Sequence, residues 1–406
     1  MNSDALHRWQ TPLMVIVAGC LISMVGFGVR SVFGLFLEPM TVARGWDRET
    51  FALAMAIQNL LWGMAAPVAS AFADRCGPSR VLAIGALLYG AGVWGMAATT
   101  SGIGLHLFGG VLIGLGVAFT AFSIALAAMA KVVGPQRRSL VLGLGTAAGS
   151  FGQVLFSPLG QLFISEFGWF NALLILAATL LVIIPLAWIL PHDSTHPGPM
   201  HLQQSLGEAV REAASHRGFV LLNMGFFVCG FHVAFITVHF PAYVRDLGMA
   251  SQVGAYSIAI IGLFNLAGSV LSGMAGQRWS KRYGLSCIYI SRAVVITALM
   301  LAPKTELTIY LFAAAMGLLW LSTVPLTSGI VAQVFGVRYM ATLFGIVLFS
   351  HQVGSFIGVW LGGYLYDQTG SYDPVWWTAV GLGFASALIH MPIDEKPLAR
   401  LAEEQA

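Results

Sequence analysis

The sequence predicts an all-α membrane protein with twelve transmembrane helices in two pseudo-symmetric bundles of six. Three observations predict this fold class: an apolar composition, a series of long apolar stretches and an internal repeat. Of the 406 residues, 57% are hydrophobic and 9% are charged. Because soluble chains carry about 25% charged residues, this chain has too few polar side chains to cover a water-exposed surface.

Twelve stretches are long and apolar enough to cross a bilayer, which takes roughly 20 helical residues. We expect the first to be retained, because it is too long for the apolar part of a secretory leader and lacks a clear cleavage site. The spans are expected at residues 12–37, 49–72, 79–98, 103–129, 139–163, 167–190, 218–244, 252–275, 284–302, 307–332, 341–365 and 375–391.

The positive charges predict an orientation. With the amino terminus inside, the outer loops hold Arg44, Arg48, Arg245 and Lys304, whereas the cytoplasmic stretches hold most of the other lysines and arginines. This asymmetry follows the positive-inside rule and places both termini in the cytoplasm.

A repeat divides the chain around a polar linker. A shift of about 202 residues places GVRSVFGLFLEP, which starts at Gly28, over GFHVAFITVHFP, which starts at Gly230. Arg30 then falls on His232. Two bundles related in this way suggest a transporter with its site between the halves. The expected division is an amino-terminal bundle at 1–190, a cytoplasmic linker with one short surface helix at 191–217, and a carboxy-terminal bundle with a short cytoplasmic tail at 218–406.

Enzymes and nucleic-acid-binding proteins are disfavoured. The net charge of +3 comes without a basic tract, and the four cysteines lack metal-ligand or redox spacing. The segment GLGTAAG, which starts at Gly143, resembles a phosphate loop, but it falls inside an expected helix with no strand before it. We therefore expect no catalytic residues, no metal, no cofactor and no nucleic acid.

The expected spans contain cations, whereas the acidic residues lie in loops, tails or helix ends. A charge at the bilayer centre costs about 2.5–3.5 kcal/mol or more, so such a residue should face a cavity or a partner. A site for cationic drugs needs a carboxylate, whereas a site for carboxylates needs an arginine and neutral donors. The cations of the spans therefore favour an anionic substrate. The ionisable groups of the spans are Arg30, His232, His239, Arg292 and His351.

Arg30 is the first candidate for contact with a substrate anion. Ser23, Phe27 and Gly34 share its helical face and would form a small, partly aromatic lining. The alternative is that Arg30 extends to the outer lipid interface. The other candidates for the substrate site are Asn59, Gln153, His232, Tyr256, Asn265 and His351, although the amides could instead bond neighbouring helices and the aromatic ring could simply pack.

Histidines are the candidates for proton coupling, because an unperturbed imidazole titrates near pH 6.5. His232 and His239 are seven residues apart and share one helical face, about 10.5 Å apart along the helix. The candidates are His232, His351 and His239. The alternative for each is a neutral ring that is hydrogen-bonded between helices.

Part of the sequence resembles a known family. Asp74, Arg75, Gly77 and Arg80 match the signature loop between helices 2 and 3 of the major facilitator superfamily, and the resemblance extends over nearly the whole chain. The segment RRSLVLGLGTAAGSFG, residues 137–152, resembles helices 4–5 of monocarboxylate transporters and oxalate/formate antiporters.

The resemblance implies roles for several residues. Helices 1 and 7 would line a central path, and the signature loop would form a cytoplasmic gate. Arg292 would lie on a supporting helix and bind backbone carbonyls or bridge helices rather than contact substrate. The implied gate residues are Asp74, Arg75, Arg80 and Arg278.

The resulting hypothesis is secondary active transport of small organic anions, foremost monocarboxylates, by alternating access with proton symport or anion exchange. The partners would be the organic anion, a proton or counter-anion, and the lipid of a bacterial plasma (inner) membrane, with the protein working as a monomer. One alternative is an exporter of amphipathic compounds or drugs, against which Ser157 before Pro158 argues, because such exporters carry a Gly-Pro pair there. A non-transporting membrane receptor ranks below both.

Overall fold

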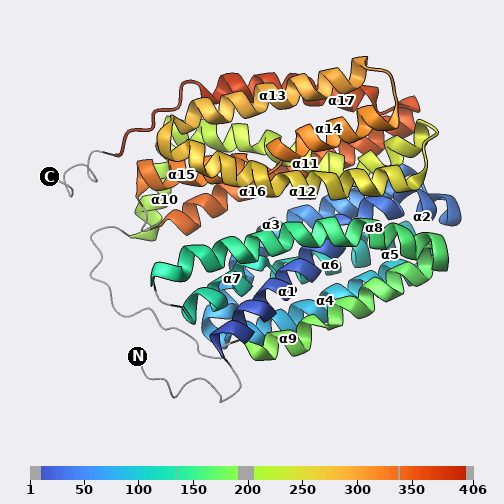
Figure 1. Ribbon diagram of the computed structural model, residues 1–406, viewed down its shortest axis with the longest axis horizontal. Helices are drawn as coiled ribbons and strands as arrows, with labels where there is room; N and C mark the ends of the chain where they lie inside the picture. The colour runs from blue at the N-terminus through green and yellow to red at the C-terminus, as the bar shows by residue number, and fades with distance from the viewer. Residues whose placement is uncertain (1–10, 134, 191–204, 337–338, 399–406) are drawn as a thin grey trace.

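The computed structural model describes residues 11–133, 135–190, 205–336 and 339–398, without the side chains of residues 74, 122, 130, 131, 135–140, 142, 143 and 341. Every regular element in these residues is a helix, and the helices form two bundles (Figure 1). The amino-terminal bundle contains α1 (Pro12–Ser31), η2 (Phe33–Phe36), α2 (Leu37–Arg44), α3 (Arg48–Cys76), α4 (Pro78–Ala98), α5 (Gly102–Leu105), η3 (His106–Leu112), α6 (Ile113–Phe119), α7 (Phe122–Lys131), α8 (Pro135–Leu181) and α9 (Ile183–Ile189). After α10 (Leu206–Ser215), the carboxy-terminal bundle contains α11 (Arg217–Asp246), α12 (Ser251–Arg278), α13 (Lys281–Leu301), α14 (Glu306–Leu319), α15 (Thr323–Phe335), α16 (Met340–Thr369) and α17 (Asp373–His390).

The twelve expected spans are recognisable in these helices. Ten stretches of the described residues are long and apolar enough to cross a membrane. One of them, Leu144–Ile189, holds two spans, because α8 breaks at Gly168 with φ of 75°. This left-handed conformation is accessible to glycine, which has no side chain to clash with the backbone. The 18 residues of α17 lie outside these ten stretches and correspond to the twelfth expected span.

Some spans consist of several short helices. The first begins at Thr11, whose side chain accepts a hydrogen bond from the amide of Met14, with Pro12 in the favourable first position. It then runs through α1, η2 and α2, so its helical geometry changes just after Arg30. The tenth span breaks between Leu319 and Thr323, at the junction of α14 and α15, which leaves backbone carbonyls without helical partners.

The short surface helix expected in the linker is α10. The Ser205 hydroxyl accepts a hydrogen bond from the Glu208 amide at 3.3 Å, and the Glu208 carboxylate accepts one from the Ser205 amide at 2.8 Å. This reciprocal cap starts the helix. The backbone hydrogen bond lowers the pKa of the Glu208 carboxyl group, so the cap is fully formed at neutral pH. Residues 191–204 of the expected linker lie outside the described part.

The two bundles meet along two pairs of helices, α3 with α16 and α8 with α12. We call the end that carries α10 the linker end, and the opposite end, which carries α2 and the turn between α16 and α17, the far end. In Figure 1 the bundles approach each other at the far end, on the right, and their ribbons diverge toward the linker end. Every hydrogen bond that the structure describes between the bundles lies at the far end or near the middle of the spans.

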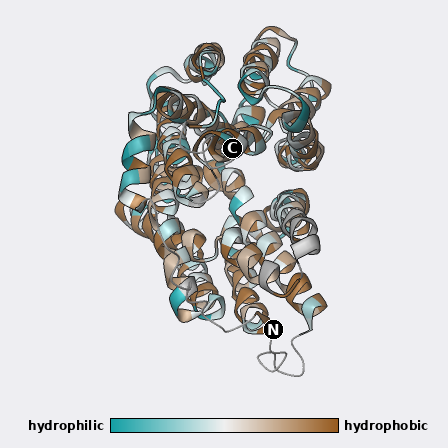
Figure 2. Ribbon diagram, turned by 90° about the vertical axis from the view of Figure 1, so that its left-hand side faces the viewer, coloured by the Kyte–Doolittle hydropathy of each residue, from teal (hydrophilic) through white to brown (hydrophobic). Residues whose placement is uncertain are grey.

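Hydrophobic residues, brown in Figure 2, make up much of both bundles, and many large ones are exposed. Large exposed examples are Leu13, Val42, Ile103, Val270 and Leu388. Extensive apolar surface is unusual for a protein in water and marks a site of contact with another apolar phase. A lipid bilayer around the bundles would cover these side chains.

Candidate functional site

Arg30 lies in the last turn of α1 and contacts α3. Its Nη2 donates a hydrogen bond to Oδ1 of Asn59 at 2.5 Å, and its guanidinium carbon lies 4.4 Å from the centre of the Trp62 ring. The Asn59 amide is itself fixed, because its Nδ2 donates to the carbonyl of Met55 at 2.8 Å. An amide oxygen and an aromatic face therefore hold the guanidinium in place.

The guanidinium of Arg30 keeps unused hydrogen-bonding capacity. Its Nε is buried and has no partner, and neither ion pair found among the described residues involves it. An amide and an aromatic ring stabilise a cation only in part, so its charge can still attract an anion. The side chain is directed between helices rather than to the lipid interface, which was the alternative reading of this residue.

Two cavities meet at Arg30. The first has an empty volume of about 270 Å³ and is lined from both bundles, by Gln58 and Asn59 of α3 and by Thr237 of α11 among others. The second, of about 320 Å³, lies within the amino-terminal bundle and includes Phe27 and Trp62 in its lining. Arg30 thus lines a small cavity between the bundles and a second one within the amino-terminal bundle. The residues expected on its helical face line these cavities, Gly34 the first and Ser23 and Phe27 the second.

Two glutamines beside the interface are also incompletely hydrogen-bonded. Nε2 of Gln58 and Oε1 of Gln352 are buried and have no partner. Gln58 lines the first cavity, and Gln352 packs across the interface, where a β-carbon on Gly63 would lie 2.6 Å from its Cγ. An anion bound at Arg30 would therefore have a neutral donor, Gln58, in the same cavity.

Three other candidates for the substrate site lie elsewhere. Nε2 of Gln153 donates to the carbonyl of Ile258 at 3.0 Å, and Nδ2 of Asn265 donates to the hydroxyl of Ser150 at 3.2 Å. Both amides therefore join the bundles through α8 and α12, as the alternative reading of these amides expected. Tyr256 is 47% exposed and lines neither cavity at Arg30.

The structure separates the three candidate histidines from Arg30. Nε2 of His232 lies 2.8 Å from the carbonyl of Ala379 on α17, which directs the ring into the carboxy-terminal bundle. Nε2 of His239 lies 2.8 Å from the carbonyl of Val359, and its Nδ1 lies 3.1 Å from the hydroxyl of Tyr372. A ring that donates to a carbonyl and accepts from a hydroxyl is neutral. These contacts favour the neutral alternative for His239 and leave coupling by His232 a prediction.

His351 differs from the other two histidines. Its Nδ1 lies 3.5 Å from the hydroxyl of Ser355, at the limit of a hydrogen bond, and its ring lies 5.2 Å from that of Phe226. Neither contact fixes the ring as neutral. Its role in coupling also stays a prediction.

Arg292 is completely buried within the carboxy-terminal bundle. Its Nε and Nη2 donate to the carbonyl of Leu319 at 3.2 and 2.7 Å, and Nη2 also donates to the carbonyl of Trp320. These carbonyls lie at the break between α14 and α15. The expectation that Arg292 binds backbone carbonyls is confirmed.

The expected gate lies at the linker end. Gly77, with φ of 85°, joins α3 to α4, and Arg75 and Arg80 flank it with exposed side chains. Arg278 is exposed in the last turn of α12. The side chain of Asp74 lies outside the described part, so the gating role of these residues stays a prediction.

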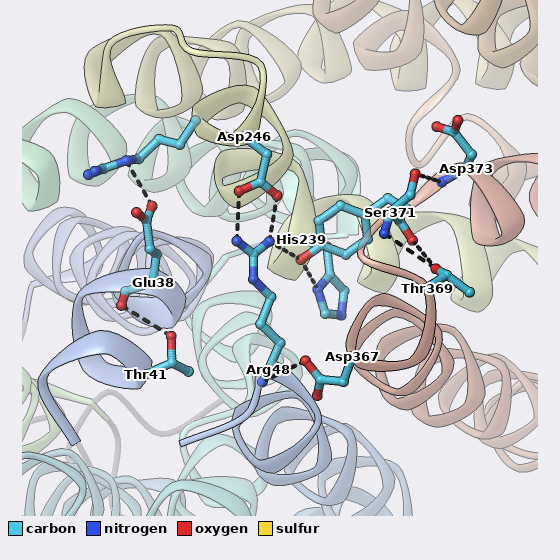
Figure 3. A network of polar contacts seen from close by, with 11 residues as sticks. Glu38, Thr41, Arg48, His239, Asp246, Asp367, Thr369, Ser371 and Asp373 are labelled. Carbon is cyan, nitrogen blue, oxygen red and sulfur yellow. Dashed lines mark hydrogen bonds and ion pairs between the residues drawn. The ribbon is translucent and has the colours of Figure 1, made fainter. Parts of the chain in front are cut away.

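The structure reveals a set of contacts at the far end that the sequence alone did not indicate (Figure 3). Arg48, at the start of α3, donates from Nη1 and Nη2 to both carboxylate oxygens of Asp246 on α11, at 2.6 and 2.7 Å. Its Nη1 also donates to the hydroxyl of Tyr372 at 2.9 Å, and its guanidinium carbon lies 3.8 Å from the centre of the Tyr366 ring. Burial raises the pKa of the Tyr372 phenol, so the hydroxyl stays protonated and can donate to His239.

Further contacts join the same end of the bundles. The carboxylate of Asp367 on α16 accepts hydrogen bonds from the backbone amides of Arg48 and Glu49, at 3.2 and 2.6 Å, and so caps α3 from the other bundle. Nε1 of Trp360 donates to the Glu49 carboxylate at 3.0 Å, and Arg245 pairs with Glu38 at 2.8 Å. We call the contacts of Arg48, Glu49, Asp246, Asp367, Trp360, Glu38 and Arg245 the far-end latch.

Two helical bundles with a cavity between them, lined by an arginine that has no carboxylate partner among the described residues, are typical of a membrane transporter. The family is shown by sequence: the chain belongs to the Major Facilitator Superfamily, whose model matches residues 19–283 and 225–406.

Several relatives cover most of the chain. Monocarboxylate transporter 13 of Rattus norvegicus is 26% identical over 90% of this chain and 86% of its own length. Monocarboxylate transporter 11 of Homo sapiens is 27% identical over 88% of this chain and 78% of its own. An uncharacterized MFS-type transporter, YcxA of Bacillus subtilis (strain 168), is 25% identical over 92% of this chain and 91% of its own.

Solved structures show the same fold at lower identity. A bacterial homolog of the human lysosomal transporter Spinster, in an inward-facing and unoccupied conformation, gives a TM-score of 0.72 at 14% identity and covers 95% of both chains. A D-xylose–proton symporter gives a TM-score of 0.70 at 15% identity and covers 95% of this chain and 99% of its own. These likenesses show the fold, and the family match identifies the chain as a multi-pass membrane transporter of this superfamily and not an enzyme.

Proposed function

We propose that the chain is a secondary active transporter of small organic anions, foremost monocarboxylates, which works by alternating access with proton symport or anion exchange. The observation that carries the proposal is the guanidinium of Arg30, which faces two cavities without a carboxylate partner. One fixed cation with a neutral donor beside it suits a single carboxylate group. The names of the relatives from rat and human support the same substrate class.

The orientation belongs to the same proposal. The positive-inside rule favours a linker end, and both termini, in the cytoplasm of a bacterial inner membrane. The protein would work as a monomer, with an amino-terminal bundle at 1–190, a linker at 191–217 and a carboxy-terminal bundle at 218–406. In this orientation the far-end latch would close the outer side, and the protein would be open to the cytoplasm. Labelling of single cysteines from either side of intact cells tests this orientation.

Uptake into proteoliposomes tests the function. The purified protein should take up radiolabelled short monocarboxylates saturably, and dicarboxylates should compete weakly because the first cavity has one cation. The variant Arg211→Ala, which removes an arginine from α10 at the linker end, is the matched control for Arg30→Ala. The proposal fails if folded wild-type protein neither takes up nor exchanges any of the short monocarboxylates that are tested.

An exporter of amphipathic compounds is the second candidate. Phe27 and Trp62, which line the cavity within the amino-terminal bundle, would suit an apolar cargo. A thermal-shift screen separates the two, because organic acids should stabilise the wild type but not Arg30→Ala, whereas neutral or cationic amphipathic compounds should stabilise both. A receptor that does not transport would bind organic acids but show no flux.

A further inference from the structure

Besides the two cavities at Arg30, a cavity with an empty volume of about 320 Å³ lies between the bundles at the far end. We call it the far-end cavity. It adjoins the first cavity at Arg30, because Gly34 lines both. Its polar lining comes from both bundles and consists of Glu38 of α2, Gln161 of α8, Arg245 of α11 and Ser251 of α12.

The first span and α11 line both cavities, one deeper than the other. Arg30 of the first span and Thr237 of α11 line the inner cavity, and Glu38 and Arg245, each eight residues further along, line the far-end cavity. Eight helical residues rise about 12 Å. The two cavities therefore form two levels of one path between the bundles, with the cation of Arg245 at the outer level and that of Arg30 at the inner one.

Gly34 separates the two levels. A β-carbon at this position would collide with the backbone carbonyl of Thr237 and with the backbone of Val238, so the first span and α11 are in direct contact here. This contact belongs to the conformation that is closed at the far end. An anion in the far-end cavity lies on the outer side of the contact, whereas an anion bound to Arg30 lies on the inner side.

The ion pair of Arg245 with Glu38 leaves part of the guanidinium fork unused. Nε of Arg245 lies 2.8 Å from Oε2 of Glu38, but that oxygen has no hydrogen-bond partner among the described residues, and Nη1 donates to the hydroxyl of Ser251 at 3.0 Å. The pair of Arg48 with Asp246 is bidentate by contrast. The side chains of Arg245 and Glu38 are 44% and 25% exposed, and such pairs contribute little to stability. A free carboxylate that binds Arg245 in the bidentate geometry can therefore replace Glu38.

We propose that Arg245 is an entry site, at which the carboxylate of a small monocarboxylate replaces Glu38 before the anion passes Gly34 and reaches Arg30. The inference rests on the proposed function, and in the orientation proposed there the entry site faces outward. Displacement of Glu38 removes one contact of the far-end latch, so the arriving anion weakens the closure of that end. The two cations then have different roles: Arg245 captures the anion, and Arg30 holds it between the bundles.

Two single-charge changes distinguish an entry site from a simple latch contact. Uptake by intact cells of the radiolabelled short monocarboxylate that the wild type carries fastest, corrected for cells without the protein, gives the KM from the outside. Glu38→Gln frees Arg245 and should lower this KM, whereas Arg245→Gln removes the capturing charge and should raise it, each about threefold for a partly exposed pair. A latch contact alone predicts shifts in the same direction, because both variants break the same ion pair. The double variant should behave as Arg245→Gln does.

Matched controls and a change of salt complete the test. Lys304→Gln and Glu306→Gln remove charges at the same end but outside the far-end cavity, so both should keep the wild-type KM. Raising the ionic strength should raise the KM of the wild type more than that of Arg245→Gln, because salt screens an exposed charge. The salt dependence of the wild type requires no variant, so it tests the entry site even if Arg245→Gln does not fold.

The outcomes separate this inference from the proposed function. Shifts of KM in the same direction for Glu38→Gln and Arg245→Gln, or a wild-type KM that does not change with ionic strength, would overturn the entry site and leave monocarboxylate transport intact. If the wild type takes up no short monocarboxylate, the proposed function fails and the entry site fails with it.

Discussion

At the scale of single residues, the contacts of Arg30 predict how its variants behave. Arg30→Ala removes the cation that would neutralise a carboxylate, a hydrogen bond to a charged group worth about 1.5–3 kcal/mol. We expect binding of monocarboxylates to weaken roughly 10- to 100-fold and uptake to fall accordingly. Arg30→Lys should keep part of the activity, because an ammonium group supplies the charge but not the planar fork. Calorimetry and proteoliposome uptake measure the two effects.

Asn59 provides an internal check on this prediction. Asn59→Asp would place a carboxylate 2.5 Å from the Arg30 guanidinium, where the amide oxygen now lies. The new carboxylate should pair with Arg30 and compete with the substrate, so binding should weaken although Arg30 is still present. Unchanged affinity in both Arg30→Ala and Asn59→Asp would show that the anion binds elsewhere.

The histidines give a second prediction at this scale. His351→Gln should lose proton-driven accumulation and keep exchange, because the change removes a titratable ring whose contacts with Ser355 and Phe226 do not fix it as neutral. His232→Gln tests the other candidate, and its amide nitrogen can still donate to the Ala379 carbonyl that the ring contacts now, so the fold should be kept. Measuring the proton-driven accumulation of a monocarboxylate at several external pH values compares the two variants with the wild type. Coupling lost in His232→Gln but kept in His351→Gln would reverse the assignment.

At the scale of elements, the far-end latch holds α3 against α11 and α16. Asp246→Asn removes the charge from the bidentate contact with Arg48, and a partly exposed pair of this kind contributes about 1 kcal/mol. We expect the population open at the far end to rise about fivefold. The rate at which an impermeant thiol reagent labels Thr237→Cys from the outside measures this change. Asp394→Asn, at the linker end, is the control and should leave the labelling rate unchanged.

Close packing at the interface gives another prediction for the elements. A β-carbon on Gly34 would collide with the backbone carbonyl of Thr237 on α11, and nothing lies within 4 Å of a β-carbon on Gly381. Gly34→Val should therefore prevent closure at the far end, slow transport and increase outside labelling. Gly381→Val should be tolerated. Equal transport by both variants would show that this approach of the bundles is not needed.

The helices could be predicted because each is a long apolar stretch, and that property is local. The far-end latch could not be predicted, because Arg48 and Asp246 are 198 residues apart and a single sequence gives no sign that two such charges are in contact. The same holds for Glu49 and Trp360, which are 311 residues apart. Arg30 could be singled out because a charge in an apolar stretch is visible locally. Its partner Asn59 could be named only as one of several amides.

At the scale of the whole molecule, transport requires the two bundles to close at the linker end after they open at the far end. The exposed native thiols Cys76 of α3 and Cys287 of α13 lie in opposite bundles and can be spin-labelled in a Cys20→Ser background, with Cys229 buried. We expect one long distance without substrate and an additional shorter one with a saturating monocarboxylate. Pulsed electron paramagnetic resonance measures both, and an unchanged distribution would contradict alternating access.

The unpaired guanidinium of Arg30 also has an electrical consequence. The empty site carries one positive charge, and a bound monocarboxylate cancels it. Because a membrane potential acts on an elementary charge with about 2.3 kcal/mol per 100 mV, voltage would act on the empty carrier, and it would act on the loaded carrier as well once a coupled proton has restored the positive charge. With the linker end in the cytoplasm, an inside-negative potential would favour the conformation of the empty carrier that is closed at the far end. An energised membrane would therefore increase the fraction of empty carriers whose site faces inward.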